Sequence, residues 1–269
     1  MSCPEDYPLG LDWLKMLVGG AVFSPYVKHE KPCNLIIIAP ASAGKTTVLK
    51  LFSQIPSVIY VNSFTTYSFL REYAGKLANG EKRTIIIPDF MSLISYTTKD
   101  QREGSAKLVK FLSSLIEEGI EEMSSFYFTI SGRKISANVL TCLTPRILSD
   151  KKHKWSEIGF LSRFIPISYH LTDYTKMKII QWIKTHDRSM EYKIEKSIPR
   201  EYVDVELPTK YEDEIMKTVE IITKDLDAYP FRPFINIMSL VKGIALFMNK
   251  TAVDDEVMQW FRKGAKYIN

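Results

Sequence analysis

The stretch NLIIIAPASAGKTT, residues 34–47, decides the expected fold. Its apolar run at 35–38 contains three isoleucines, and β-branched residues of this kind predict a buried strand. Small residues follow at 39–44, and KTTVLKLF at 45–52 predicts a helix that continues to about Ser53, ahead of Pro56. A strand, a small-residue loop and a helix in this order are typical of a phosphate-binding loop.

Such a loop wraps backbone N–H groups around nucleotide phosphates, helped by the positive end of the helix dipole. Lys45 is expected to reach the β- and γ-phosphates, and the Thr46 hydroxyl to hold Mg²⁺. The match is Ala-x-x-x-x-Gly-Lys-Thr, and an alanine is small enough for the turn if its φ stays negative. The alternative is a chance Gly-Lys-Thr in a surface loop. The residues expected to bind the nucleotide are Ala39, Pro40, Ala41, Ser42, Ala43, Gly44, Lys45, Thr46 and Thr47.

A second apolar run, TIII at 84–87, leads through Pro88 to Asp89. An unbroken apolar run predicts a central parallel strand, and a carboxylate at its carboxyl end is well placed to bind Mg²⁺ together with Thr46. The alternative is that Asp89 caps a helix or closes a turn. ATPases of this broad class usually follow this aspartate with a glutamate that activates water, but Phe90 stands here. Glu117 and its acidic neighbours are expected on a solvated helix face.

The composition indicates a globular intracellular protein. The chain has 269 residues, 45% of them hydrophobic and 25% charged, with a net charge of +5 and three scattered cysteines. The longest apolar stretch, 13–27, is interrupted by Lys15 and Pro25, so no membrane span is expected. We therefore expect a soluble, cytoplasmic protein without a membrane partner. The mild positive charge permits an acidic partner such as nucleic acid.

The remaining segments predict an α/β core with helices after it. A strand at 139–145 carries Thr144 at its end, where the hydroxyl either orients water between Asp89 and the phosphates or caps the next turn. Arg163 precedes the last strand, at 165–170, and is expected to project to a surface. The predicted division is a core at 1–172 with a leader helix, a connecting helix and linker at 173–207, and a helical lid at 208–269. The leader helix either packs near the nucleotide base or covers a sheet edge.

A basic hairpin is predicted between the helix at 100–122 and the strand at 139–145. Its turn is expected at Ser131 and Gly132, with Arg133 and Lys134 at the tip beside three aromatic residues at 126–128. Cations next to aromatic side chains can contact a nucleic-acid strand. The alternative is a plain hairpin whose aromatic residues pack inward.

Taken together, these parts resemble the AAA+ ATPases, the P-loop superfamily that assembles into rings. The similarity is to compact viral or mobile-element members that are distantly related to the minichromosome-maintenance helicases, and it covers most of the chain. Lys45 and Thr46, Asp89, and Thr144 at the sensor-1 position carry it. Because Arg163 lies in a Ser-Arg-Phe, the resemblance implies an arginine finger for the neighbouring subunit's site. It also implies that Arg232, at the start of a lid helix, senses nucleotide in cis.

The resemblance implies a motor that uses ATP and Mg²⁺, works as a homo-oligomeric ring or filament and acts on nucleic acid, with DNA favoured, as a helicase or replication factor does. Since no separate DNA-binding domain is visible, a recruiting protein is a possible further partner. The alternative is a slowly hydrolysing scaffold, loader or partner-recruiting switch, which Phe90 favours. A small-molecule kinase is less consistent with the sequence, because its lid would lie within the core rather than at the C-terminus.

Overall fold

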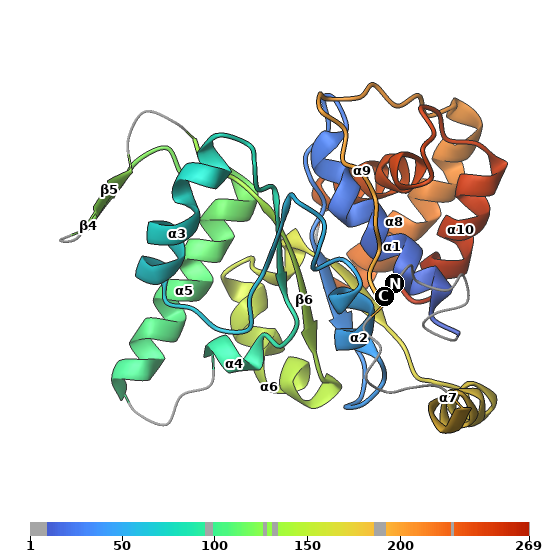
Figure 1. Cartoon of the computed structure of the whole chain (residues 1–269), viewed down its shortest axis with the longest axis horizontal. Coiled ribbons are helices and arrows are strands. Elements are labelled where there is room, and N and C mark those ends of the chain that lie inside the picture. The colour runs from blue at the N-terminus through green and yellow to red at the C-terminus, as the bar shows by residue number, and fades with distance from the viewer. Residues whose placement is uncertain are drawn as a thin grey trace.

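The core of the protein is a five-stranded parallel sheet with helices on both faces (Figure 1). The computed structural model describes residues 10–94, 99–125, 128–130, 134–185, 192–226 and 229–268. The strands are β1 (Leu35–Ile38), β2 (Val58–Tyr60), β3 (Thr84–Ile87), β6 (Asn138–Leu143) and β7 (Ile165–Ser168), in the order β2-β3-β6-β1-β7. The predicted α/β class with a parallel sheet is therefore confirmed.

The strands form where the sequence is mainly apolar, although Thr84, Asn138 and Thr141 are buried polar residues within them. Every residue of β1, β3 and β6 is buried, as parallel strands covered on both faces require. Strand β6 lies between β1 and β3, with Ile38 of β1 opposite Leu143 of β6. The carboxyl ends of β1, β6 and β7 therefore meet at one edge of the sheet, which we call the carboxyl edge. The opposite edge is the amino edge.

Two hydrophobic clusters hold the helices to the sheet. One face is covered by α3 (Thr66–Ala78), α5 (Lys99–Glu117) and α6 (Pro145–Glu157), with the short α4 (Met91–Ile94) beside them. The other face is covered by α1 (Asp12–Phe23) and α2 (Lys45–Lys50), backed by α8 (Glu212–Leu226), α9 (Phe231–Phe247) and α10 (Asp255–Ala265). Short 3-10 turns occur at Ser24–Tyr26 (η1), Leu161–Arg163 (η2) and Thr209–Tyr211 (η3).

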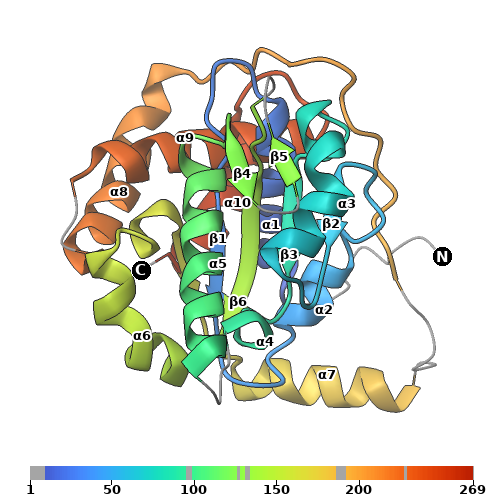
Figure 2. The same ribbon diagram turned by 90° about the vertical axis from the view of Figure 1, so that its left-hand side faces the viewer.

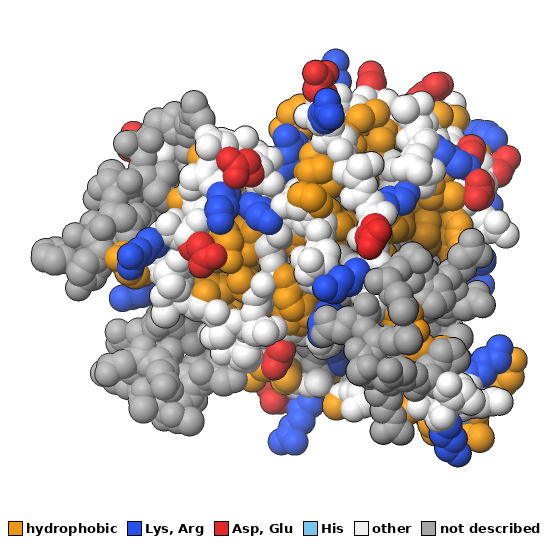
Figure 3. Space-filling model, in the orientation of Figure 1, with side chains coloured by type: hydrophobic (Ala, Val, Ile, Leu, Met, Phe, Trp, Pro, Cys, Tyr) orange, Lys and Arg blue, Asp and Glu red, His pale blue; other side chains and the backbone are white. Residues whose placement is uncertain are grey.

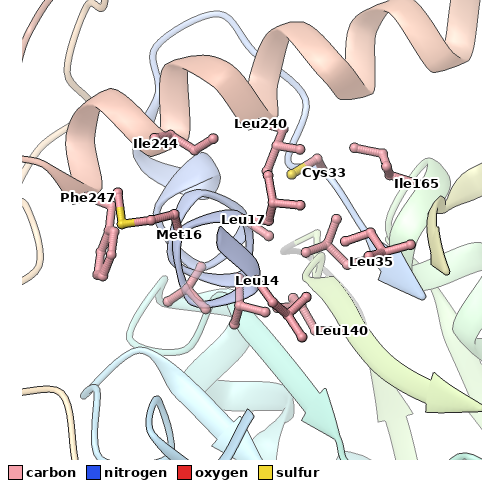
Figure 4. Packing of buried hydrophobic residues seen from close by; sticks show 14 of the residues in the cluster. Leu14, Met16, Leu17, Cys33, Leu35, Leu140, Ile165, Leu240, Ile244 and Phe247 are labelled. Carbon is pink, nitrogen blue, oxygen red and sulfur yellow. The ribbon is translucent and has the colours of Figure 1, made fainter. Parts of the chain in front are cut away.

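The predicted C-terminal helices are present, and they pack against α1 as well as against one another. Helix α1 lies between the sheet and α9 (Figure 4). Leu17 of α1 points toward Leu240 of α9, and Leu14 points toward Leu140 of β6. One continuous cluster thus joins the segment expected as a lid to the core. The leader helix therefore covers a face of the sheet rather than its edge.

Two glycines allow α1 and α9 to approach this closely. A Cβ added to Gly243 would lie 2.1 Å from the carbonyl oxygen of Gly20, and one added to Gly20 would lie 2.5 Å from Ile244. No side chain fits at such a crossing. Gly19 and Gly20 lie inside α1 and form its contact with α9.

A short antiparallel hairpin lies between α5 and β6. Strands β4 (Met123–Ser125) and β5 (Phe128–Ile130) pair antiparallel, with Ser125 opposite Phe128. This pairing lies before the expected turn at Ser131 and Gly132, and those two residues fall outside the described part of the chain. An antiparallel bridge between the buried Ile120 and Ile135 closes the base of the hairpin.

Helix α7 (Asp173–Thr185) differs from the other long helices because none of its residues is buried. It lies beyond the carboxyl edge, whereas the β4–β5 hairpin lies at the amino edge (Figure 2). Tyr174 and Met177 have exposed fractions of 69% and 65%. Apolar and lysine side chains are both visible there in Figure 3. The predicted connecting helix is thus present, but none of its side chains is buried against the rest of the chain.

Candidate functional site

The loop at residues 39–44, which the sequence predicts to bind phosphate and which we call the phosphate loop, joins β1 to α2 at the carboxyl edge. Gly44 caps α2 with a φ of 85°, a conformation that favours glycine, and Ser42 has a φ of 61°. The Ala39 amide donates to the Leu143 carbonyl oxygen at 3.3 Å, which fixes the loop beside the end of β6. Helix α2 ends at Lys50, earlier than predicted, and turns follow it. With so short a helix, the loop backbone and Lys45 are the groups left to bind phosphate.

Lys45 lies across the mouth of this loop. Its Nζ donates to the carbonyl oxygens of Ala39 and Pro40 at 2.6 and 2.7 Å. Burial lowers the pKa of the Lys45 ammonium, while the nearby charge of Asp89 acts in the opposite direction. The other loop residues differ in exposure: Ala39 and Ala43 are buried, Pro40 and Gly44 are half-buried, and Ala41, Ser42, Thr46 and Thr47 are exposed.

Asp89 lies at the same edge, two residues after β3. Its Oδ1 accepts a hydrogen bond from the Met91 amide at 3.0 Å, so the turn role considered for it is realised. The charge of Asp89 nevertheless acts to raise the pKa of Lys45, and both residues follow strands at the carboxyl edge. Thr46 and Asp89 are the residues that could hold Mg²⁺, because hydroxyl and carboxylate oxygens suit this ion.

Thr144 stands between these two parts of the site. It follows β6, the strand that separates β1 from β3. Thr144 occupies the N-cap position of α6, but its side chain makes no capping hydrogen bond. Of the two roles considered, capping is therefore not observed in this structure, and the hydroxyl is available to a bound ligand.

Phe90 is a core residue. It is fully buried, its ring stacks on Phe160 at 5.6 Å between centroids, and it meets Trp155 edge-on at 5.7 Å. An acidic side chain at this position would face apolar rings, at a high desolvation cost. The position after Asp89 thus supplies packing rather than a general base.

Arg163 and Arg232 meet on one carboxylate at the amino edge. Arg163 Nε donates to Glu117 Oε2 at 2.8 Å, while Nη1 contacts the Gly159 carbonyl. Arg232 pairs with the other oxygen of Glu117 and donates to the Ser162 hydroxyl at 3.1 Å. We call Glu117, Arg163 and Arg232 the arginine cluster. It contains two positive charges and one negative charge.

This arrangement corrects three expectations. Arg163 does not project to the surface, since only 15% of its side chain is exposed. Arg232 does not reach the phosphate loop of its own chain, because it joins Arg163 at the opposite edge. Glu117 is not on a solvated face, as its side chain is 22% exposed and engaged by both guanidiniums.

The electrostatics of Glu117 follow from these contacts. Burial raises its pKa, but the hydrogen bond and charge of Arg163 and the charge of Arg232 outweigh burial, and the net result is a pKa below the usual value. The carboxylate therefore stays ionised near neutral pH. The backbone anchors the cluster as well, because Asn34 Nδ2, just before β1, donates to the Arg163 carbonyl at 3.0 Å.

Sequence reasoning missed Tyr169, which follows β7 and is 3% exposed. Its hydroxyl donates to the carbonyl oxygen of Ala43, inside the phosphate loop, at 2.8 Å. The sequence signal that could have found Tyr169 is its place directly after β7, because β7 pairs with β1, the strand that leads into the phosphate loop.

The predicted nucleic-acid residues lie at the amino edge or outside the described structure. Arg133 falls outside the described residues. Lys134 is exposed, with its Nζ 3.7 Å from the Glu121 carboxylate. It lines a cleft of about 480 Å³ together with Lys31, Lys82, Arg83, Glu117 and Glu118. Cations outnumber acids among these charged residues of the cleft.

No model of a known protein family matches the sequence, and no curated protein matches it. Within the described ranges, no helix combines the length and apolar character that crossing a bilayer requires. The described residues also contain no group of three or more histidine, cysteine or acidic side chains arranged to hold a metal ion.

Proposed function

We propose that the protein is an AAA+-type ATPase that binds Mg²⁺-ATP at the phosphate loop and uses it to act on nucleic acid. The observation that carries this proposal is the placement of Lys45 and Asp89. They come from β1–α2 and β3, two strands separated by β6, and meet at one edge of a parallel sheet. Ligands of α/β proteins bind at that edge.

The residues present suit phosphoryl transfer, which needs positioning and charge stabilisation more than covalent chemistry. Backbone amides of residues 41–46 would surround the β-phosphate, and Lys45 would exchange its two carbonyl partners for phosphate oxygens. Thr46 and Asp89 would hold Mg²⁺, which neutralises charge on the phosphates. Thr144 would orient water beside the γ-phosphate.

The second part of the proposal is a head-to-tail homo-oligomer, either a ring or a filament. The arginine cluster and the phosphate loop lie at opposite edges, so the cluster of one copy can face the loop of the next. An interface of this kind is heterologous and either closes into a ring or extends as a filament. Arg232, with 43% of its side chain exposed, is more accessible than Arg163 for a neighbour's phosphate.

Exposed apolar side chains at both edges support such an assembly. Beside Arg232, Tyr229 and Phe231 are 82% and 73% exposed and stack on each other. At the other edge, Tyr174 and Met177 are exposed on α7. Since apolar surface of this kind is costly in water, we assign both regions to the interface between copies.

Nucleic acid is the proposed substrate, with DNA favoured, on the strength of the net charge of +5 and the basic cleft at the amino edge. Arg133 and Lys134 are the proposed contacts near the hairpin. A recruiting protein would bring the ATPase to its site.

The second candidate function is an ATP-dependent scaffold, loader or switch that hydrolyses slowly. The buried Phe90 favours it, because this position cannot supply a base to the attacking water. The two candidates share nucleotide binding and differ in turnover.

Steady-state ATPase rates with and without single-stranded DNA separate the candidates, measured on the intact protein and on Lys45→Ala and Arg163→Ala. A motor predicts turnover that DNA stimulates and that both substitutions abolish. Turnover below about one per minute that DNA does not change favours the switch. If Arg163→Ala leaves the rate unchanged while Lys45→Ala abolishes it, the trans arrangement is wrong. If the intact protein binds no ATP, the proposed function fails as a whole.

A further inference from the structure

A buried hydrogen bond ties the phosphate loop to the strand beside it. Tyr169 Oη donates to the Ala43 carbonyl oxygen at 2.8 Å, and both residues are at least 95% buried. The Tyr169 amide also donates to the Ile38 carbonyl at 3.1 Å, so the tyrosine is anchored to the last residue of β1. Burial raises the pKa of the Tyr169 phenol, which keeps the hydroxyl protonated and able to donate.

This hydrogen bond fixes the orientation of one peptide unit in the loop. In a trans peptide the C=O and N–H groups point in opposite directions. Because the Ala43 carbonyl points into the core toward Tyr169, the Gly44 amide N–H points away from the core. Gly44 has a φ of 85°, and glycine accepts many backbone conformations, so without an anchor this peptide could turn over.

The tyrosine ring is held in turn by the two ends of the chain. Trp13 of α1 meets the Tyr169 ring edge-on at 5.4 Å between centroids, and Tyr267 stacks on Trp13 at 4.0 Å. The Tyr267 carbonyl accepts from the Ser168 amide at 2.7 Å, and Ile268 bridges to Ile167 of β7. The segment after α10 therefore continues the sheet edge directly beside Tyr169.

We propose that Tyr169 is a positioning residue that holds the phosphate loop ready to bind nucleotide, and that Trp13 and Tyr267 connect it to the C-terminal helices. The role assigned to the loop rests on the proposed function. Tyr169 itself need not touch the nucleotide, because it acts through the Ala43–Gly44 peptide. The C-terminal bundle would influence nucleotide affinity through this chain of contacts, and not as a hinged lid.

The test is Tyr169→Phe, which keeps the ring and removes only the hydroxyl. A protein whose binding-competent state is populated to a fraction f binds with a Kd larger by 1/f. If the unanchored peptide is correctly oriented about a tenth of the time, the Kd for Mg²⁺-ATP rises about tenfold, equivalent to about 1.4 kcal/mol. Isothermal titration calorimetry measures this value, and a urea unfolding curve of the same variant measures its stability.

Tyr211→Phe is the matched control. Tyr211 is also buried, and its hydroxyl donates to Asp255 Oδ1 at 2.8 Å, within the C-terminal helices. We expect it to lower stability but leave the Kd within twofold of the intact protein. If both variants lose stability and neither changes the Kd, the Tyr169 hydroxyl is only structural and the proposal is overturned.

Hydrogen exchange of the ligand-free protein separates failure of this inference from failure of the proposed function. We expect amides of residues 41–46 to exchange faster in Tyr169→Phe than in the intact protein and in Tyr211→Phe. Faster exchange supports the positioning role even if the intact protein binds no nucleotide, in which case the proposed function alone fails. Unchanged exchange in this segment overturns the inference regardless of what the loop binds.

Discussion

Glu117→Gln is the most informative perturbation of the arginine cluster. The substitution keeps the shape of the side chain and one acceptor oxygen but removes the charge that two guanidiniums share. The contact with Arg163 is mostly buried, at 15% and 22% exposed fraction, whereas Arg232 is 43% exposed. The Glu117–Arg163 ion pair should therefore contribute more to the free energy of unfolding than the Glu117–Arg232 pair.

The expected loss of stability follows from these exposures. Breaking a buried ion pair costs about 3–5 kcal/mol, and an exposed pair contributes about 0–1 kcal/mol. Because glutamine retains a hydrogen bond, we expect a loss at or just below the bottom of this range, about 2–3 kcal/mol in total. For a chain of this size that corresponds to a fall in Tm of about 5–10 °C.

The pH dependence gives a second readout. The pKa of Glu117 is lowered in the folded protein from its ordinary value of 4.5, so its stabilisation is present above that value and is lost as pH falls through the folded pKa. The stability gap between the intact protein and Glu117→Gln should therefore shrink below about pH 4.5.

Glu118→Gln is the control, since Glu118 is exposed and makes no ion pair within the described part of the chain. Urea unfolding at pH 7 and pH 4 measures all three proteins. Equal stability of the two variants at pH 7, or a gap that is independent of pH, would refute the cluster as described.

Three further predictions test other parts of the structure. A Cβ at Gly243 would lie 2.1 Å from a backbone oxygen of α1, so Gly243→Ala should cost about 3 kcal/mol in urea unfolding, whereas Gly75→Ala, with nothing within 4 Å, should be neutral or stabilising. Asp89→Asn keeps an acceptor for the Met91 amide, so Tm should stay within about 2 °C while the Kd for Mg²⁺-ATP rises at least tenfold in titration calorimetry. Met177→Glu should leave stability unchanged but shift sedimentation toward monomer, and an intact protein that is monomeric with ATP would contradict the oligomer.

The sheet and the phosphate loop were predictable because their signals are local. The runs at 35–38 and 84–87 are apolar without interruption, and a central parallel strand requires this pattern wherever it lies in the chain. Gly44 supplies the backbone conformation that the loop requires, and Lys45 supplies its positive charge. The position of Asp89 beside the loop then follows from the rule that carboxyl ends of parallel strands share an edge.

The hairpin register was not predictable from its turn residues. Ser131 and Gly132 are good turn formers, but β4 and β5 pair with Ser125 opposite Phe128, and the Phe-Tyr sequence between these two residues carries no turn signal. The packing of the C-terminal helices against α1 was not predictable for a similar reason. Periodicity predicted these helices, whereas the glycine crossing that joins α9 to α1 depends on two segments more than 200 residues apart.

Strand length separates the arginine cluster from the phosphate loop of the same chain, which is why the proposed function places a second copy beside it. The four residues of β1 span about 13 Å. Asn34, just before β1, binds the Arg163 carbonyl, and the phosphate loop begins just after β1. Arg163 and Arg232 therefore lie a full strand length from the loop of their own chain, held there by Glu117. If they act on phosphate at all, the phosphate must belong to a neighbour, and its charge must compete with Glu117 for the guanidiniums. Glu117→Gln should then weaken folding but make Arg232 easier to transfer to the neighbour, so stability and assembly would change in opposite directions.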